Sequence, residues 1–332
     1  MHAAVFRQHG STDNIRWEAF PDPECGESDV VLRMHAAALN GFEPMIVFKT
    51  TALKTPLPMI VGGDGAGEVV ATGSAVTGVS VGDRVSIYPM VPGEGMTGET
   101  RLGTCAELHR VPAANVIPIP DGLDYQAAAS LPIAYGTALR MMHTRGRVKA
   151  GEKVLVLGAA GGVGTACVQL AKAAGAEVIA CSSSAWKLER LRELGADHVV
   201  DTSTTDFRQW VWDNCGKPRM GQGGGVDMVV NYIGGDTWVD SLKVISPGGR
   251  MLVCGATAGY ETANDCRYIW TYEISIVGSN GWTREDQAEM LRMAADGRIR
   301  PVIHDVRPMR ETGAAVQVLA DRDFFGKLVL VP

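Results

Sequence analysis

A glycine-rich turn between an apolar stretch and a helical pattern is the strongest chemical signal in the chain. In "VLVLGAAGGVG" the turn is made of small residues, namely Gly158, Ala159, Ala160, Gly161, Gly162, Val163 and Gly164. Small residues let backbone N–H groups approach a pyrophosphate, and the N-terminus of the following helix adds partial positive charge. Because the turn lies between a strand and a helix, the segment predicts a dinucleotide-binding site.

The end of the next apolar strand indicates which dinucleotide binds. An NAD site presents Asp or Glu there to the ribose 2′-hydroxyl, but this chain has Ser182, followed by Ser183, Ser184 and Lys187. No carboxylate repels a 2′-phosphate, three hydroxyls can donate to it, and a lysine can pair with it. We therefore predict NADPH, with NADH as the alternative if Ser184 only caps the next helix and Lys187 is solvated.

Four polar residues in the first third of the chain are candidates for orienting or protonating a substrate. Asn40 either orients the nicotinamide or an acceptor oxygen, or caps a turn. Glu43 is either a proton relay or a solvated loop acid, and the loop acid is the preferred interpretation. Asp64, in "GGDGAG", is either a turn-stabilising carboxylate, which we prefer, or part of the substrate site. Tyr88 either lines the site or is a half-buried strand tyrosine.

Large apolar residues near these candidates can form a substrate pocket, although each can equally belong to an ordinary core. They are Phe42, Met45, Phe48, Trp270 and Trp282. The seven cysteines are scattered without a C-x-x-C pair, so they predict buried thiols in a reducing cytoplasm rather than a zinc site or a disulfide framework.

Two patterns of strand, turn and helix signals along the chain predict the elements that carry these residues. Up to "VIPIPDGLD" short alternating strands are separated by glycine, proline and aspartate, which indicates a mostly antiparallel β-domain. After Tyr125 short apolar strands alternate with helices, which is typical of a doubly wound parallel sheet. The tail from Gly281 predicts one helix and then short strands ending in "GKLVLVP".

Composition excludes several classes of partner. The 332 residues are 46% hydrophobic and 20% charged, with a formal net charge of −6, which disfavours binding to nucleic acid or to an anionic membrane. The N-terminus lacks the pattern of a signal peptide. The uncharged stretch from Val154 to Ala171 is interrupted by glycines, so we expect a strand and a helix there rather than a membrane span. These features predict a cytoplasmic protein.

Together, several motifs resemble the medium-chain dehydrogenase/reductase superfamily over essentially the whole chain. They include "AAALNGFEP", "GGDGAGEVVATGSAVTGVSVGDRV", "GTCAELHRVPAANVIPIPDGL", "AAASLPIAYGTALRMM", "LGADHVVD" and "SPGGRMLVCGAT". The resemblance implies an α/β chain with a GroES-like catalytic domain (1–122 and 281–332), a Rossmann domain (123–280) and an active site in the cleft. It also implies a homodimer or homotetramer that pairs near "YEISIVGSN".

The same resemblance assigns further residues to the cofactor. Thr137 matches a residue beneath the nicotinamide, and Lys327 matches a lysine near the cofactor. The segments after the later strands supply Gly255, Ala256, Thr257 and Ser279.

The resemblance is to the zinc-free, quinone-oxidoreductase-like branch. Zinc-containing members have a cysteine near Asn40, histidines near Gly63 and Thr100, and a cysteine-rich lobe, none of which this chain has. The chain also departs from the quinone-reductase pattern, because Gly41, Glu43, Met45 and Val47 replace the expected proline, aspartate, tyrosine and arginine, so the substrate class is less well indicated than the fold.

Hydride transfer without zinc favours acceptors whose negative charge is delocalised. Reducing a conjugated C=C bond or a quinone gives an enolate or phenolate, whereas a simple ketone gives an alkoxide that usually needs a metal or an acid. We therefore predict a zinc-independent, NADPH-dependent reductase of enones or quinones. A zinc-independent alcohol dehydrogenase or ketone reductase is the alternative, with Tyr88 or the cofactor ribose serving the ketone. A non-catalytic NADPH-binding protein is a remote third possibility.

Overall fold

The computed structural model describes all 332 residues, which form two compact units. One unit contains residues 1–135 and 283–332, and the other contains residues 136–282. The first unit extends past the expected boundary at residue 122 because helix α2 (Tyr125–Ser130) packs on strands β3, β5 and β18 of that unit.

The first unit is built mainly from antiparallel strands. Its seven-stranded sheet has the order β10-β6-β5-β3-β18-β17, with β9 also paired to β3, and β1 lies between β2 and β4 in a second sheet. The strands are β1 (His2–Phe6), β2 (Ile15–Ala19), β3 (Asp29–Leu39), β4 (Met59–Ile60), β5 (Asp64–Thr72), β6 (Arg84–Ile87), β7 (Met90–Val91), β8 (Gly95–Met96), β9 (Leu108–Pro112), β10 (Val116–Pro118), β17 (Ile303–Pro308) and β18 (Lys327–Val331). The helices besides α2 are α1 (Phe42–Phe48), α3 (Pro132–Leu139, which crosses into the second unit), α9 (Arg284–Ala295) and α10 (Thr312–Ala320).

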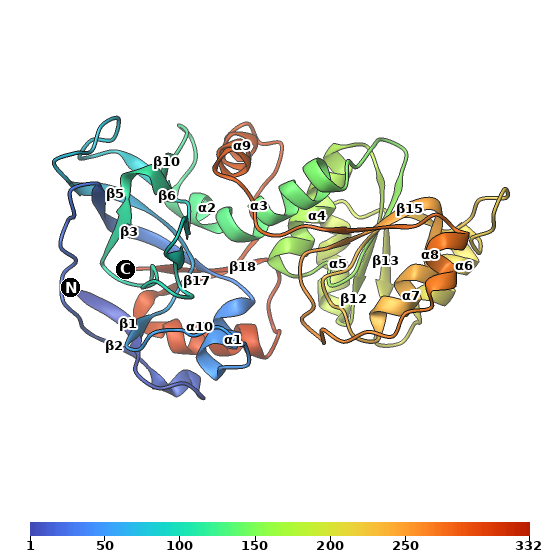
Figure 1. The fold of residues 1–332 in the computed structure, drawn as a ribbon, viewed down its shortest axis with the longest axis horizontal. Coiled ribbons are helices and arrows are strands. Elements are labelled where there is room, and N and C mark those ends of the chain that lie inside the picture. The colour runs from blue at the N-terminus through green and yellow to red at the C-terminus, as the bar shows by residue number, and fades with distance from the viewer. The chain divides into compact units, whose positions relative to one another are not determined.

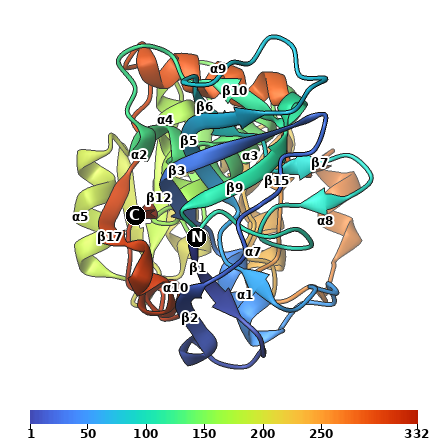
Figure 2. The same ribbon diagram turned by 90° about the vertical axis from the view of Figure 1, so that its left-hand side faces the viewer.

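The C-terminal segment completes the sheet of the first unit. Strand β18 pairs antiparallel with β3 and parallel with β17, so the last residues of the chain lie beside some of its first. Figures 1 and 2 show the red elements α10, β17 and β18 among the blue and teal strands. The site residues on β18 therefore depend on a pairing between segments almost 300 residues apart.

Helix α10 is a difference from the sequence prediction, which places only one helix in the tail. The helix contains a glycine and β-branched valines, which lower its intrinsic helix propensity. Its residues Ala315, Val316 and Leu319 are buried in the same core as Phe6 and Ile15. Tertiary packing, which no local pattern reports, stabilises it.

The second unit is a doubly wound parallel sheet. Its six strands have the order β13-β12-β11-β14-β15-β16, with α4 and α5 on one face and α6, α7 and α8 on the other (Figure 1). The strands are β11 (Lys153–Val156), β12 (Glu177–Ser182), β13 (His198–Asp201), β14 (Val226–Val230), β15 (Ile245–Val253) and β16 (Ser275–Gly278). The helices are α4 (Gly162–Ala173), α5 (Ala185–Glu193), α6 (Phe207–Cys215), α7 (Thr237–Val244) and α8 (Cys266–Thr271), and a π-helical turn at Arg140–Arg145 extends α3. The predicted fold class, a Rossmann sheet plus a GroES-like β-domain, is confirmed.

No helix has both the length and the apolar character that crossing a bilayer requires. The uncharged stretch from Val154 to Ala171 is divided between β11 and α4, as the sequence predicts.

Gly164 holds α4 against the turn that follows β11. A Cβ atom at this position would lie 2.5 Å from the carbonyl oxygen of Gly158 and 2.6 Å from the Cα of Ala159, both backbone atoms that cannot swing away. Gly161 differs, because the nearest atoms to its Cβ position lie 3.8 Å away. Packing therefore requires a glycine at residue 164, whereas at residue 161 a Cβ atom would make only ordinary contacts within the protein.

We expect Gly164→Ala to lower the free energy of unfolding by about 1–3 kcal/mol, because backbone atoms must shift to accept the methyl group. The matched control Gly161→Ala should lose less, about 0.5–1 kcal/mol, which is the cost of replacing glycine by alanine at a helix N-cap. Urea unfolding followed by circular dichroism measures both changes, and equal stability of the two variants would contradict the packing role.

Candidate active site

Three strand ends meet at one point of the first unit and place Asn40, Asp64 and Lys327 together. Asn40 follows the last residue of β3, Asp64 begins β5 and Lys327 begins β18. The register pairs Ala38 with Asp64 and Leu39 with Leu328, so the residues next to these pairs are neighbours. The sheet itself therefore brings together residues that lie far apart in sequence.

Hydrogen bonds join the three side chains into a closed network. Lys327 Nζ donates to Asp64 Oδ2 at 3.0 Å and also to Asn40 Oδ1. Asn40 Nδ2 donates to Asp64 Oδ2 at 3.0 Å. The exposed fractions are 7% for Asn40, 0% for Asp64 and 1% for Lys327, so Asn40 is the most accessible of the three.

Glu43 is a buried second acid beside this network. It lies in the first turn of α1, is 2% exposed, and accepts hydrogen bonds from the backbone N–H groups of Asn40 at 2.7 Å and Gly63 at 3.1 Å. The preferred sequence interpretation, a solvated loop acid, is therefore wrong. Its side chain folds back to satisfy two backbone donors that would otherwise be unpaired inside the protein.

Burial controls the charge of the two acids. Desolvation raises the pKa of Glu43 to about 8, against the opposing charge of Lys327. Desolvation raises the pKa of Asp64 as well, while Lys327 and the hydrogen bond from Asn40 lower it. Because Lys327 contacts Asp64 directly, we assign the ion pair to Asp64 and Lys327 and the bound proton at neutral pH to Glu43.

Asp64 is more than a turn-stabilising carboxylate. Its Oδ1 accepts from the backbone N–H of Ile133 at 3.0 Å, and its carbonyl oxygen accepts from Thr104 Oγ1 at 2.7 Å. Asp64 thus joins β5, α3 and the segment before β9. The sequence contains no signal for the Ile133 contact, because a backbone N–H exists at almost every residue.

The residues around this network do not fit a zinc ion. A Cβ atom at Gly63 would lie 2.6 Å from Phe42 Cζ and 2.7 Å from Ile133 Cδ1, so those side chains fill the space that a ligand at residue 63 needs. The ammonium group of Lys327 already holds Asp64. No three His, Cys, Asp or Glu side chains in the chain are grouped so that they could hold a metal ion.

The other predicted residues of the first unit lie near α1 and β6. Phe42, Met45 and Phe48 are half-buried on α1, and Phe42 is the one whose ring covers Gly63. Tyr88 is half-buried directly after β6, and its backbone exchanges hydrogen bonds with Asn115.

In the second unit the predicted cofactor residues gather at the carboxyl edge of the sheet. The glycine-rich turn follows β11 and leads into α4, whose N-cap Gly161 supplies no capping side chain. The Gly164 N–H, in the first turn of α4, donates to the Tyr232 hydroxyl. First-turn N–H groups that no side chain caps suit a pyrophosphate. A Cβ atom at Gly161 would meet only the Gly158 carbonyl oxygen and the Tyr232 hydroxyl, both at 3.8 Å, so no close contact covers the backbone there.

Tyr232 links two of these segments and was not predicted. Its hydroxyl donates to the carbonyl oxygen of Gly158 at 2.6 Å, while its own carbonyl oxygen accepts from Thr257 N–H at 3.1 Å. It thereby fixes the glycine-rich turn against the segment Gly255–Thr257. Its place just after β14 is the signal that could have found it, because ligands bind beyond the carboxyl ends of parallel strands.

Two buried hydroxyls at the same edge fit a polar ligand. Ser279 follows β16, is 7% exposed, and its Oγ has no hydrogen-bond partner within the protein. Ser182 ends β12 and is 8% exposed. A buried hydroxyl without a partner is costly, so a bound cofactor that supplies one would be stabilised. This edge therefore fits a dinucleotide.

The segment after β12 keeps its hydroxyls available. Ser184 is the N-cap residue of α5 but makes no side-chain capping bond, so the capping interpretation is not what the structure shows. Lys187 lies with its ammonium 5.3 Å from the centre of the Trp186 ring. Asp201 is the register partner of Ser182 on β13, and its carboxylate accepts two hydrogen bonds from Ser203.

The remaining predicted residues of this unit divide into a buried pair and an exposed residue. Trp282 packs on Gly136, next to Thr137, and both Trp282 and Thr137 are at least nine-tenths buried. Trp270 lies on α8 and is 66% exposed, which does not fit a side chain enclosed in a pocket of one chain.

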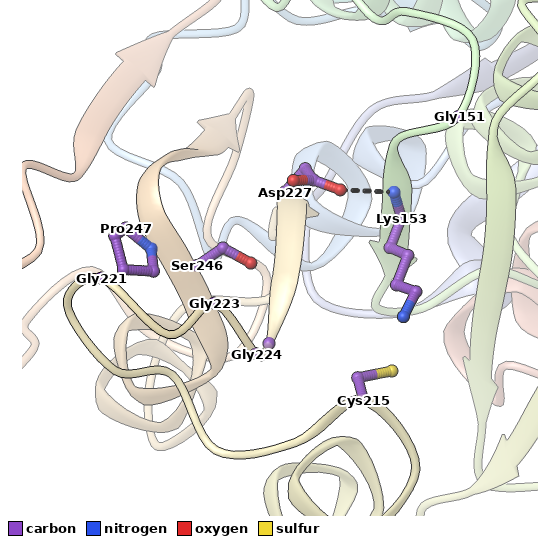
Figure 3. A pocket seen from close by; sticks show the side chains of 10 residues that line it. Gly151, Lys153, Cys215, Gly221, Gly223, Gly224, Asp227, Ser246 and Pro247 are labelled. Atoms are coloured by element: carbon purple, nitrogen blue, oxygen red, sulfur yellow. Dashed lines mark hydrogen bonds between the residues drawn. The ribbon is translucent and has the colours of Figure 1, made fainter.

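A polar cavity of about 480 Å³ lies at the opposite, amino edge of the same sheet. Figure 3 shows Lys153 and Cys215 beside it, with the backbone N–H of Lys153 donating to Asp227. None of the predicted site residues lines this cavity, so it is separate from the candidate dinucleotide site.

The proton on Glu43 predicts a pH-dependent stability. Its pKa is raised from 4.5 to about 8 in the folded chain, so its contribution to stability is complete below the lower value and is lost as the pH rises to the upper one. The loss is at most about 1.4 kcal/mol per pH unit. Urea titrations from about pH 5 to 8 should show wild type losing stability relative to Glu43→Gln, which cannot ionise.

The amide of Glu43→Gln leaves one backbone N–H without an acceptor, which lowers its stability at every pH but does not change the slope. Glu24→Gln, at an exposed acid, is the control and should follow wild type. A difference between wild type and Glu43→Gln that is constant with pH would show that Glu43 is ionised throughout.

Comparisons with known proteins agree with this organisation. The alcohol dehydrogenase GroES-like domain matches residues 26–121, and the zinc-binding dehydrogenase domain matches residues 162–296. Crotonyl-CoA reductase of Streptomyces avermitilis is 29% identical, over 91% of this chain and 78% of that protein. Acryloyl-coenzyme A reductase of Metallosphaera sedula is 28% identical, over 99% of each chain.

The fold is also similar to that of a solved structure. An NAD-dependent alcohol dehydrogenase is 33% identical, covers 100% of both chains and has a TM-score of 0.91. The two domain matches, this similarity and the glycine-rich turn at the carboxyl edge of the sheet support one conclusion. The chain belongs to the medium-chain dehydrogenase/reductase superfamily and is an NAD(P)H-dependent oxidoreductase.

Proposed function

We propose that the protein is a zinc-independent, NADPH-dependent reductase of an activated C=C bond, with an α,β-unsaturated acyl thioester as its substrate class. The observation that supports this proposal is the buried Asn40–Asp64–Lys327 network. It lies beside residues 40 and 63, where the sequence resemblance implies ligands in zinc-containing members. The crotonyl-CoA and acryloyl-CoA reductases among its relatives support the thioester class.

The second unit supplies the cofactor site in this proposal. The first turn of α4 receives the pyrophosphate, and the hydroxyls of Ser182, Ser183 and Ser184, with Lys187, receive the 2′-phosphate. When bound, NADPH supplies a hydride. Ser279 Oγ, which has no partner in the protein, would donate to or accept from the same cofactor.

The first unit supplies a hydrogen-bond donor for the substrate. Hydride addition to the β-carbon of an unsaturated thioester moves negative charge to the carbonyl oxygen. Asn40 Nδ2 uses one N–H for Asp64 and keeps a second N–H to donate to that oxygen. A neutral donor suits a delocalised enolate, and each such donor contributes about 10²–10³ in rate when it is preorganised.

A second candidate is a zinc-independent alcohol dehydrogenase or ketone reductase. It is favoured by the 33% identity to an NAD-dependent alcohol dehydrogenase over the whole chain. The alkoxide formed by ketone reduction concentrates charge on one oxygen and needs an acid or a metal. Glu43 holds a proton but is 2% exposed, and the residues around Gly63 do not fit zinc, so the thioester is the better match.

The test is NADPH consumption by chelator-treated enzyme with crotonyl-CoA, a benzoquinone and a simple ketone. Butyryl-CoA, which lacks the C=C bond, is the matched control. We expect the highest kcat/KM with crotonyl-CoA, no loss of activity after chelation, and no stoichiometric zinc by elemental analysis. Turnover of the ketone alone, or activity that is lost on chelation and restored by zinc, would overturn the proposal.

Cofactor preference follows from the segment after β12. We expect Lys187→Ala to weaken NADPH binding about tenfold by removing a charge-assisted hydrogen bond, with salt reducing the effect. Ser182→Asp should weaken NADPH further and improve NADH binding. Fluorescence titration of both cofactors at fixed salt measures these changes.

Two control variants distinguish a specific role of the segment after β12 from general effects of substitution on cofactor binding. Arg192→Ala removes a cation from the other end of α5 and should leave both affinities unchanged. Gly161→Val should abolish binding of both cofactors by filling the space above the turn. A wild type that already prefers NADH, or an NADPH/NADH ratio that neither Lys187→Ala nor Ser182→Asp moves, would refute the assignment of this segment.

A further inference from the structure

The orientation of the Asn40 side chain is dictated by the chemistry of its two partners. An ammonium group can only donate hydrogen bonds and an ionised carboxylate can only accept them. Lys327 donates to Asn40 Oδ1, and Asp64 accepts from Asn40 Nδ2. Rotating the amide by half a turn would face donor to donor and acceptor to acceptor at once, so only one orientation is stable.

This fixed orientation determines what Asn40 offers to a ligand. One N–H of Nδ2 is committed to Asp64 and the oxygen faces Lys327, so the second N–H is the donor that remains. Without the two charges the amide could equally present its oxygen, which would repel an enolate. The polarity of the remaining hydrogen-bonding edge of Asn40 is therefore set by the buried ion pair.

We infer that Lys327 is a positioning residue that acts through Asn40, holding its amide so that an N–H group faces the substrate oxygen. Lys327 is 1% exposed, and Nζ is within hydrogen-bond distance of both Asn40 Oδ1 and Asp64 Oδ2. This assignment differs from the role near the cofactor that the sequence resemblance implies for the lysine. The inferred role toward the substrate rests on the proposed function, which names the substrate. The orientation of the Asn40 amide does not depend on the proposed function.

The network also explains why an asparagine serves at this position. Aspartate at residue 40 would place another buried carboxylate beside Asp64 and Glu43, and leucine would leave Lys327 with one partner fewer. Asparagine is neutral, and it presents an acceptor to the lysine and donors to the carboxylate and the substrate. The amide therefore transmits the polarity of the ion pair to its second N–H group, while both charges stay buried.

A double-mutant cycle tests the inference with the substrate from the panel that wild type reduces fastest. Asn40→Ala should lower kcat by about 10²-fold, as for loss of one oxyanion donor, and Lys327→Met should lower it by a similar factor. The double variant should be less than about threefold slower than Asn40→Ala, because residues that act as a unit are not additive. The Kd for NADPH should stay within about twofold of wild type, since the lysine is engaged by Asn40 and Asp64.

Lys327→Arg is the conservative variant and should retain much more activity than Lys327→Met, because it keeps a cation that can donate to Asn40. Lys327→Met leaves a buried carboxylate unpaired, so Lys327→Met/Asp64→Asn, which removes both charges together, is the substitute if the single variant does not fold. It should lower kcat at least tenfold, and full activity in it would overturn the inference. The inference would also be overturned if the decreases in kcat of Asn40→Ala and Lys327→Met were additive in the double variant. A Lys327→Met variant with normal kcat but weaker NADPH affinity would overturn it as well.

A measurement without substrate separates this inference from the proposed function. In apo protein labelled with ¹⁵N-asparagine, the Asn40 side-chain amide should exchange its hydrogens slowly and give two well-separated proton signals. Lys327→Met/Asp64→Asn should make that exchange much faster, whereas Glu24→Gln should not change it. Rapid exchange of Asn40 in wild type would refute the fixed orientation whatever the substrate, and absence of enoyl-thioester turnover would refute only the proposed function.

Discussion

The buried ion pair between Lys327 and Asp64 is the interaction on which the first unit's chemistry depends. A charge buried without a partner is strongly unfavourable, and removing one member of such a pair typically costs about 3–5 kcal/mol. The lysine therefore ties the start of β18 to the start of β5, and Asn40 at the end of β3 is held between them. The position of the C-terminal strand and the orientation of the Asn40 amide are two consequences of the same contact.

The pair also sets the charge of its surroundings. One lysine faces two buried acids, and it can neutralise only the one that it touches. Glu43, whose partners are backbone N–H groups, keeps a proton at neutral pH because solvation of its carboxylate is lost. The cluster is thus close to neutral, which lets it lie in a region from which Phe42 and Ile133 exclude a side chain at residue 63.

The second unit follows a simpler rule. Parallel strands present their carboxyl ends at one edge, so the glycine-rich turn, Ser182, Tyr232, the segment Gly255–Thr257 and Ser279 gather there without any long-range specificity. Two glycines refine the edge: Gly164 brings α4 close to the turn, and Gly161 adds no side chain where the pyrophosphate is proposed to bind. The first is a requirement of packing and the second a requirement of binding, which is why their substitutions are expected to separate stability from affinity.

The sequence by itself determined those features that depend on local order along the chain. Alternating strands and helices predicted the parallel sheet, and the strand–turn–helix context of "VLVLGAAGGVG" predicted the dinucleotide site, because both are properties of neighbouring residues. Tertiary structure decided whatever depends on pairing between distant segments. Glu43 carries no sequence mark of burial, α10 forms on packing rather than on propensity, and Trp270 is apolar yet exposed. The sequence identified Asn40, Asp64 and Lys327 individually as candidates. Only the pairing of β5 and β18 with β3 brings them together, because hydrogen bonds between strands join residues that are close in space but far apart in sequence.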